Sequence, residues 1–532
     1  MNSVTKSNLQ LLEIDNSLLA ELPGDNVSEN YTRQVNNACY SHVTPEAFPD
    51  AYLIACSNEM AQVLGIDPET CGSDDFVKLF SGTQLLETMK PYANCYGGFQ
   101  FGQWAGQLGD GRAINLGDVK THSGEHWTLQ LKGAGPTPYS RTADGYAVLR
   151  SSVREFLCSE AMHHLGVATT RALCLLGTGK AVVRDMFYDG HPQKEPGAIV
   201  CRVAQSFTRF GSFEIFAARN QLDVMQQLVD FTITRDFSHL GKPGKETYLA
   251  WYQEICQSTS AMIVDWMRVG FVHGVMNTDN MSILGQTIDY GPYGWLEDYD
   301  PEWTPNTTDS HTRRYKFGQQ PAIALWNLVQ LANAIHPLID DIPALENILD
   351  NYRQQYEQDY LAMMVKKLGL SQVSDNDLAL VNDLTRTLTL VETDMTLFYR
   401  HLSDIQTEDV TSPELLLHKI SPSFYADEIP DKTEQAFIDW LSRYCYRLKE
   451  NDINRNESIE LMNTVNPLYV LRNYLAQQAI DKATEGDYNM IDELQTVLKQ
   501  PYTFQEGKDH LAEKRPDWAR HKAGCSMLSC SS

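Results

Sequence analysis

The sequence is poor in positive charge. It carries 43 Lys and Arg residues against 69 Asp and Glu residues, for a formal net charge of −26, and it has no long basic run. Binding along nucleic acid depends on clustered Lys and Arg side chains that neutralise phosphates, so we expect no nucleic-acid partner. An acidic balance of this kind favours solubility and does not identify a partner.

Long hydrophobic runs are also scarce. The N-terminal stretch MNSVTKSNLQLLEIDNSLL lacks the apolar core that a secretory signal requires. We expect no apolar run of the length that a bilayer-spanning helix needs. The sequence therefore predicts a cytoplasmic protein without a membrane partner.

Cysteine occurs eleven times, but there is no Cys-x-x-Cys pair and no Cys/His group with zinc-site spacing. Thiols scattered singly along a chain are typical of a reducing compartment. Only Cys525 and Cys530 lie close together. Their spacing permits a local disulfide without requiring one, so two free thiols and a redox-active pair are both open hypotheses.

Glycine becomes dense from Tyr96, and the patterns that follow predict strands around a single helix. The predicted strands are 113–116, 127–132, 170–176, 180–184 and 197–205, and the predicted helix is 147–165. A glycine-rich loop, strands, one helix and more strands is the order of a protein-kinase small lobe. Before this region, short helical stretches alternate with loops, and beyond residue 205 helical patterns dominate.

A chain of 532 residues is too long for one ordinary domain. We predict an α+β, protein-kinase-like two-lobed fold with two additional regions. An N-terminal extension covers 1–95, the small lobe 96–204, the large lobe with its catalytic loop 205–340, and a helical C-terminal region with the Cys-containing tail 341–532.

The glycine-rich stretch that ends in Gly109-Asp110-Gly111-Arg112 is suited to phosphate binding. Glycines let the backbone approach a phosphate closely with its N–H groups as donors, and Arg112 adds a cation. A tight hairpin without a ligand explains a lone glycine turn equally well.

Lys132 ends the predicted strand 127–132, where kinases place the lysine that holds nucleotide phosphates. Period-two alternation puts Gln130 and Lys132 on the strand face opposite Leu129 and Leu131. The simpler interpretation is a solvated strand lysine.

In kinases, the strand lysine pairs with a glutamate on the next helix. Glu155 and Glu160 both lie in the predicted helix. Glu155 lies beside the apolar stripe and is favoured as the partner of Lys132. Glu160 lies nearer the stripe and is predicted to be a buried, hydrogen-bonded structural residue.

The strongest local pattern is His273-Gly-Val-Met-Asn-Thr-Asp-Asn280, followed by Asp289-Tyr-Gly. Protein kinases use H-R-D-x-x-x-x-N and then D-F-G, so Asn280 and Asp289 match the two metal-binding positions. Such oxygen ligands suit Mg²⁺ or Mn²⁺. The position of the kinase base is occupied by Val275, which cannot accept a proton, and the nearby carboxylate is Asp279.

The sequence resembles the selenoprotein O family of kinase-fold protein adenylyltransferases, in a form with cysteine where some relatives carry selenocysteine. The resemblance runs from about Tyr31 to Ser532. The matching segments are GGFQFGQWAGQLGDGRA, LQLKGAGPTPYSR, LRSSVREFLCSEAM, RVAQSFTRFGSFE, GFVHGVMNTDNMSI, IDYGP, VNPLYVLRNYLAQQAI and the terminal CSS. Phe99 and Gln103 depart from the family pattern because many relatives have histidines there, and Tyr293 departs where some relatives carry cysteine.

The resemblance implies transfer of AMP from ATP to Ser, Thr or Tyr hydroxyls of proteins, with the nucleotide bound in reverse relative to kinases. Asp279 would be the proton acceptor, Glu155 would orient Lys132, and Asn280 and Asp289 would hold the metal. The matching ATP-binding positions are Gly109, Gly111, Arg112, Lys132, Asp144, Gly145, Arg202, Arg209 and Asp289.

Three alternatives stay open from the sequence. UTP can replace ATP, since no base-reading residue can be named. A conventional kinase and a nucleotide-binding pseudokinase scaffold are the other two. Val275 argues against the kinase, and the intact set of Lys132, Asn280 and Asp289 argues against the scaffold. We expect a monomer whose partners are its protein substrates.

Overall fold

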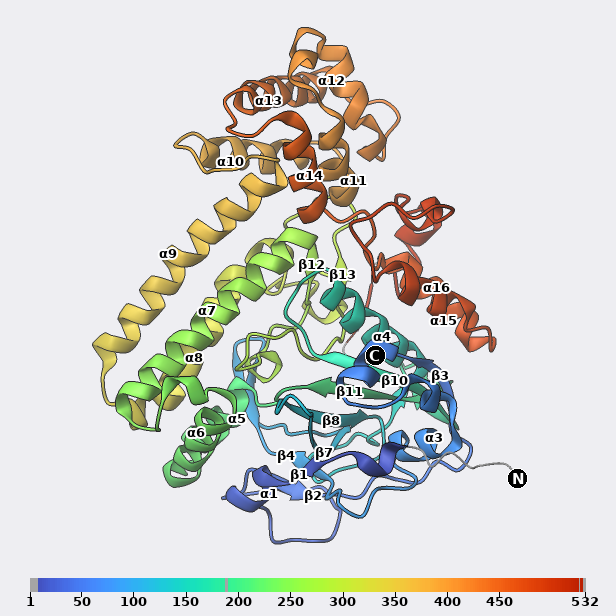
Figure 1. Ribbon diagram of the computed structural model, residues 1–532, viewed down its shortest axis with the longest axis vertical. Helices are drawn as coiled ribbons and strands as arrows, with labels where there is room; N and C mark the ends of the chain where they lie inside the picture. The colour runs from blue at the N-terminus through green and yellow to red at the C-terminus, as the bar shows by residue number, and fades with distance from the viewer. Residues whose placement is uncertain (1–7, 187–189, 526, 530–532) are drawn as a thin grey trace.

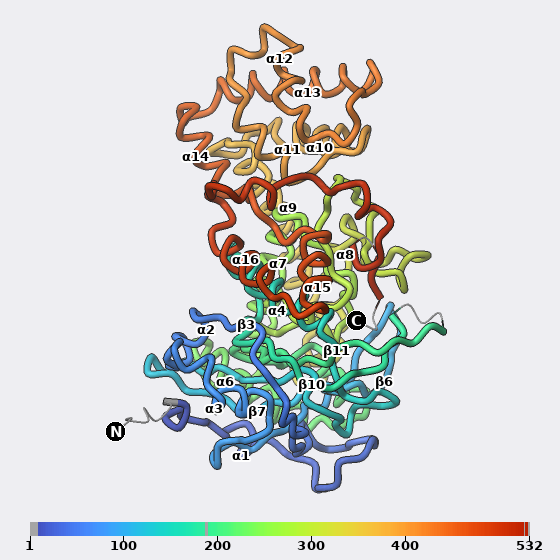
Figure 2. The backbone as a smooth tube through the Cα atoms, turned by 90° about the vertical axis from the view of Figure 1, so that its right-hand side faces the viewer, coloured from blue at the N-terminus to red at the C-terminus, as the bar shows by residue number. Residues whose placement is uncertain are grey.

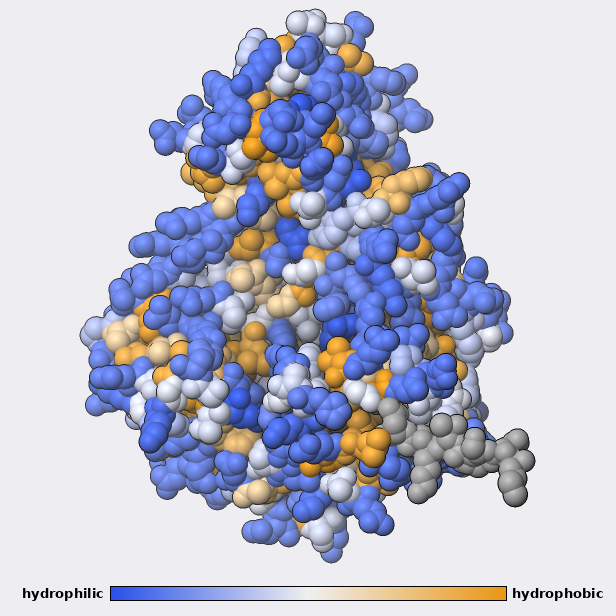
Figure 3. Space-filling view, in the orientation of Figure 1, coloured by the Kyte–Doolittle hydropathy of each residue, from blue (hydrophilic) through white to orange (hydrophobic). Residues whose placement is uncertain are grey.

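The computed structural model describes residues 8–186, 190–525 and 527–529. Within them the protein is a mixed α/β structure, with the strands of its largest sheet gathered at one end and its longest helices extending away from them (Figure 1). Hydrophilic residues cover most of the face in Figure 3, with hydrophobic residues in separate patches, as the charge of −26 favours.

One antiparallel sheet of nine strands dominates the first half of the described chain. Its main path runs β2-β4-β7-β8-β11-β10-β3, while β1 pairs with β7 and β9 pairs with β11. The strands are β1 (Ile14–Asp15), β2 (Tyr40–His42), β3 (Tyr52–Cys56), β4 (Tyr92–Asn94), β7 (Ala113–Lys120), β8 (His126–Lys132), β9 (Ala147–Val148), β10 (Arg171–Arg184) and β11 (Gln193–Ala204). Two smaller pairs are β5 (Gly97–Gln100) with β6 (Gln103–Gln107), and β12 (Phe271–Val272) with β13 (Gly294–Trp295).

The strands differ from the sequence prediction in three ways. Ala147 and Val148, predicted to begin the helix 147–165, form the strand β9, and the helix begins at Leu149. The predicted strands 170–176 and 180–184 form the single strand β10, whose pairing with β11 shifts register between Gly177 and Ala181. The segment before residue 95, expected to hold only short helices and loops, supplies β1 to β4 to the main sheet. These short strands find their partners far away in sequence, so the local pattern did not reveal them.

The helix α4 (Leu149–His164) packs against β10 and β11 and carries Val153, Phe156 and Leu157 into the larger hydrophobic core. Leu129 and Leu131 of β8 belong to a second core. Because side chains alternate along a strand, Gln130 and Lys132 face away from that second core. All four are buried, so the polar pair lies inside the protein.

Helices make up most of the second half, and the long ones α7, α8 and α9 pack on one another. Helices α10 to α14 form a separate group at the top of Figure 1, and α15 and α16 return to pack on α4 (Figures 1 and 2). The helices are α1 (Ser17–Glu21), α2 (Asn58–Val63), α3 (Asp74–Phe80), α5 (Phe210–Ala218), α6 (Leu222–Asp236), α7 (Lys245–Val269), α8 (Gln320–Ile339), α9 (Ile342–Lys367), α10 (Asp377–Leu388), α11 (Met395–His401), α12 (Pro413–Ile420), α13 (Asp431–Lys449), α14 (Arg455–Val465), α15 (Asn473–Thr484) and α16 (Asn489–Val497).

One helical stretch, Phe317–Ile339, is long and apolar enough by length and composition to cross a membrane, contrary to our expectation that no run reaches that length. Half of its most apolar window is buried, and α8 packs on α5, α7 and α9. This environment is that of a core helix.

Near the C-terminus, Cys525 is buried, and Cys530, its possible disulfide partner, lies outside the described residues.

Candidate functional site

Lys132 and Glu155 form a buried ion pair between the end of β8 and α4. The second oxygen of Glu155, Oε1, accepts a hydrogen bond from Arg202 Nη1 at 2.9 Å. Burial lowers the pKa of Lys132, and the neighbouring Glu155 carboxylate opposes that shift. Glu155 therefore holds two cations, one from each of the neighbouring strands β8 and β11.

Glu160 has a different role, although it lies only five positions further along α4. Its two oxygens accept bonds of 2.7 Å from Arg171 Nε and Nη2, and Oε2 also accepts one of 2.7 Å from the Ser57 hydroxyl. Glu160 is thus a structural ion-pair residue, and Glu155 is the glutamate beside Lys132, as the sequence favours.

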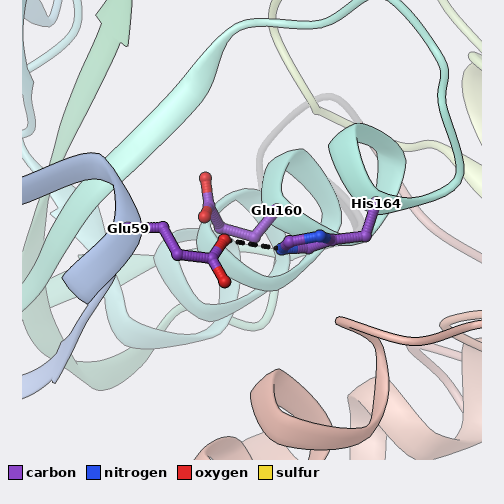
Figure 4. A group of neighbouring side chains, drawn as sticks. All are labelled: Glu59, Glu160 and His164. Carbon is purple, nitrogen blue, oxygen red and sulfur yellow. Dashed lines mark ion pairs between the residues drawn. The ribbon is translucent and has the colours of Figure 1, made fainter. Parts of the chain in front are cut away.

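Glu160, Glu59 and His164 form the group of possible metal ligands that stands apart from the predicted site (Figure 4). His164 Nε2 lies 3.1 Å from Glu59 Oε2. Glu59 also lies 3.9 Å from Arg171 and 3.4 Å from Lys499, so cations already neutralise this group. A divalent ion would compete with those cations here, as it would compete with Arg202 and Arg209 at Asp289, so the ion pairs alone do not decide between the two groups.

The loop after β12 holds the residues of the kinase-like pattern. The buried His273 ring stacks on Trp266 with a centroid distance of 5.4 Å, and its Nε2 lies 3.0 Å from the Ile288 carbonyl oxygen. Asn280 Nδ2 donates to the Val275 carbonyl oxygen at 2.9 Å. That bond orients the Asn280 carboxamide and leaves its oxygen as the group available to a ligand.

Asp289 lies where Arg202 and Arg209 converge, and both guanidinium groups contact its carboxylate. Its φ of +61° is in the left-handed region, which residues with a side chain adopt uncommonly and which Asp and Asn adopt more readily than most. Burial alone would raise the pKa of Asp289, but Arg209, Arg202 and Lys132 together hold it well below its usual range. The carboxylate is therefore ionised at neutral pH.

Asp279 is only 8% exposed and lies beside this group. Arg209 Nη1, which contacts Asp289, also donates to the Asp279 backbone carbonyl at 2.8 Å. Gln100 Nε2 lies 3.3 Å from Asp279 Oδ2, and Oδ1 has no partner among the described residues. Burial raises the pKa of Asp279 to about 6, against the lowering effect of Arg209.

The glycine-rich loop is held against Tyr139. Gly109 has a φ of +70°, and a side chain there would collide with the Tyr139 ring. A Cβ at Gly111 would lie 2.8 Å from the Tyr139 carbonyl oxygen. The Arg112 carbonyl accepts the Gly133 N–H at 2.8 Å, which ties this loop to the residue after Lys132.

Asp144 and Gly145 lie on a loop next to the segment that follows Lys132. The Gly145 carbonyl accepts the Gly135 N–H at 3.3 Å, whereas the Asp144 carboxylate pairs with Arg184 at 2.7 Å. The structure thus joins Lys132, Glu155, Arg202, Arg209, Asp279 and Asp289 through shared contacts. The predicted residues Gly109, Gly111, Arg112, Asp144 and Gly145 lie on adjoining loops.

Four polar residues of this region went unpredicted as site residues. Gln130 contacts Arg202, Asp110 lies 3.8 Å from Arg209, Gln100 reaches Asp279, and Glu214 of α5 accepts the Thr278 hydroxyl at 2.6 Å. The alternation of β8 had placed Gln130 on the face of Lys132, and Asp110 lies inside the glycine-rich stretch, but neither was assigned to the site. Gln100 and Glu214 come from segments that no local pattern connects to it.

Replacing Glu214 with glutamine should flatten the pH dependence of stability. Burial raises the pKa of Glu214 to about 8, so the folded protein keeps a proton that the unfolded chain loses near the ordinary glutamate pKa of 4.5. Stability should therefore fall as pH rises between these values, by up to about 5 kcal/mol in total. Thermal unfolding at pH 5, 6.5 and 8 measures the effect, and Glu214→Gln should gain most at pH 8. An exposed control, Glu460→Gln, should follow the wild type; equal slopes for all three proteins would contradict the prediction.

Comparison with known proteins connects this chain to one family. The sequence profile described as "Protein adenylyltransferase SelO" matches residues 26–499. A protein from Rhodopirellula baltica named "Protein nucleotidyltransferase YdiU" is 54% identical over 536 residues, covering 98% of this chain and 99% of its own. Proteins of the same name from Azoarcus sp. and Flavobacterium johnsoniae are 54% and 52% identical, each over 98% of this chain and 99% of its own length.

Proposed function

Because this chain belongs to the SelO family of protein adenylyltransferases, we propose that its site transfers AMP from ATP to a hydroxyl group of another protein. The chain is accordingly an enzyme of the nucleotidyltransferase class. We also propose that the sheet and the helices that follow it correspond to the two lobes of a protein kinase, with Lys132 and Glu155 on the first and Asp279, Asn280 and Asp289 on the second.

A single observation carries the assignment of the reaction. The position of the kinase base is Val275, a buried hydrocarbon side chain, whereas Asp279 is a buried carboxylate whose Oδ1 has no partner among the described residues. General-base catalysis requires an acceptor within hydrogen-bond reach of the reacting hydroxyl. The acceptor in this loop is therefore displaced from the kinase position to the residue directly before Asn280.

The donor set around Asp289 fits Mg²⁺ or Mn²⁺. Asp289 offers an ionised carboxylate and Asn280 an oriented carboxamide oxygen, and hard cations prefer such oxygens. Asn280 and Asp289 would hold the ion. When bound, it would neutralise phosphate charge and act as a Lewis acid at the phosphoryl group.

The remaining steps belong to the protein's own side chains. Arg202, Arg209 and Lys132 are buried cations that would hold the triphosphate, with the two arginines on the β- and γ-phosphates of a reversed nucleotide. The acceptor hydroxyl oxygen forms a bond to the α-phosphorus while the bond from that phosphorus to the bridging oxygen breaks. Pyrophosphate leaves with the electron pair, and Asp279 accepts the hydroxyl proton.

Two related nucleotide chemistries remain candidates at the same site. UMP transfer from UTP uses the same phosphate contacts, and no described residue is assigned to the base. Phosphoryl transfer from the γ position would need a base at Val275, so the site does not favour it.

Labelled ATP tests the proposal. We expect label from α-³²P-ATP to enter protein, label from γ-³²P-ATP to stay out, and pyrophosphate to be released. Intact-mass measurement with ATP or UTP and each metal in turn identifies the nucleotide transferred. Retention of the γ label, with ADP as product, would make the protein a conventional kinase.

A further inference from the structure

Four side chains form a partly exposed surface beside Asp279, which we call the aromatic–arginine shelf: Phe99, Trp104, Arg314 and Trp326. The Phe99 ring lies between the two indoles, with centroid distances of 5.2 Å to Trp104 and 5.6 Å to Trp326. The Arg314 guanidinium lies 4.6 Å from the Trp326 ring centroid. Trp104 is 38% exposed, so this aromatic cluster reaches the solvent at one end.

The hairpin β5–β6 attaches the shelf to the catalytic loop. The Phe99 N–H donates to Thr278 Oγ1 at 2.8 Å, and the Phe101 N–H donates to Asn277 Oδ1 at 3.2 Å. Gly98 allows the close approach, because a Cβ there would lie 2.8 Å from Asp279 Oδ1. Phe99 of the shelf therefore lies in the chain between Gly98, which closely approaches the Asp279 carboxylate, and Gln100, whose amide donates to it.

A buried carboxylate holds the other side of the shelf in place. Asp309 is fully buried, and its oxygens accept the N–H groups of Arg314 at 2.9 Å and Tyr315 at 2.7 Å. The Tyr315 hydroxyl in turn reaches Asn277 Oδ1 at 2.5 Å. Arg314 is thus positioned by the same loop that contacts the catalytic segment.

Positive charge without an acidic partner lies on Arg314 of the shelf and on Arg313, the residue before it in the chain. No ion pair of either arginine with an acidic residue is found in the described part of the chain, and Arg314 Nε is a buried atom without a hydrogen-bond partner there. Arg313 is exposed. In a chain of net charge −26, two such arginines beside the site favour an anionic ligand.

We propose that the aromatic–arginine shelf binds an acidic segment of the acceptor protein and so presents a neighbouring hydroxyl to Asp279. This inference rests on the proposed function. Half-buried aromatic rings provide rigid apolar contact area of the kind that anchors protein interfaces, and guanidinium groups pair with carboxylates through two parallel hydrogen bonds. Single-stranded nucleic acid also stacks on aromatic rings beside cations. A nucleic-acid strand carries a charge on every phosphate and needs clustered Lys and Arg side chains, which this sequence lacks, so a short acidic peptide segment is favoured.

Binding of two labelled peptides, measured without nucleotide, tests the shelf. Both contain one tyrosine, flanked by glutamates in one and by lysines in the other. Wild-type protein should bind the glutamate peptide about tenfold more tightly at low ionic strength, and the difference should shrink as salt is added. Arg313→Glu and Arg314→Glu should each remove the preference, and Trp104→Ala should weaken binding of the glutamate peptide. Arg386→Glu, a charge reversal at a 79% exposed position on α10, should leave the preference unchanged.

Equal binding of the two peptides by the wild type would overturn the inference, as would a preference that survives both arginine substitutions. Displacement of the glutamate peptide by a single-stranded oligonucleotide at equal concentration would also overturn it. Because this assay contains no ATP, its failure is distinct from failure of AMP transfer, which labelling of whole protein substrates measures separately. With α-³²P-ATP present, the glutamate peptide should show a lower KM than the lysine peptide.

Discussion

Asp279→Asn should lower kcat for AMP transfer by about 10²–10⁴-fold, the usual contribution of general-base catalysis, with little change in the dissociation constant for ATP. The substitution preserves side-chain shape but removes the group that accepts the hydroxyl proton. The nucleotide phosphates are proposed to contact Lys132, Arg202 and Arg209, which the change leaves intact. Single-turnover labelling and equilibrium binding of ATP separate the two quantities.

Folding of the Asp279→Asn protein is the necessary control. The wild-type carboxylate is buried with one oxygen unpartnered, so its neutral replacement should not lower the thermal stability. Gln100→Ala is a matched variant in the same contact and should reduce kcat less, because it removes only the amide donor 3.3 Å from Asp279 Oδ2. A kcat for Asp279→Asn near that of the wild type would contradict the proposed role.

Asp289→Ala should abolish transfer, with a loss of at least about 10³-fold, since several kcal/mol of charge stabilisation by the metal disappear with its ligand. The same change leaves Arg202 and Arg209, both at most 2% exposed, without the carboxylate that they share. Uncompensated buried charge is costly, so stability should fall by about 3 kcal/mol or more. Activity across a titration of Mg²⁺ and of Mn²⁺, together with thermal unfolding, measures both effects.

A matched control distinguishes this metal position from the alternative acidic group in Figure 4. Glu59→Ala removes a possible ligand from the group of Glu59, Glu160 and His164 and should leave the metal dependence of transfer unchanged. Near-normal turnover of Asp289→Ala would disprove the site assignment, and loss of metal dependence in Glu59→Ala would move the metal to the other group.

The sequence alone determined the features that depend on local order. Period-two alternation in β8 separated Lys132 from the apolar Leu129 and Leu131, and the spacing from His273 to Asn280 and on to Asp289 predicted which loop holds the proposed metal ligands. These patterns persist in the structure because strand alternation and short loops are set by residues close together in the chain. The long segments that match the family's sequence pattern identified the family, and the comparisons over nearly the whole chain confirm it.

The tertiary structure decided which distant residues meet. From helical spacing alone, both Glu155 and Glu160 were possible partners of Lys132. The packing of the sheet on α4 places Lys132 of β8 beside Glu155 and Arg171 of β10 beside Glu160, and so decides between them. Arg202 and Arg209 converge on Asp289 although they lie 87 and 80 positions from it in the sequence. Phe99 of the hairpin β5–β6 donates to Thr278, which is 179 positions away. Such contacts depend on how the elements pack, and packing is a collective result of burying their apolar faces that no local pattern records.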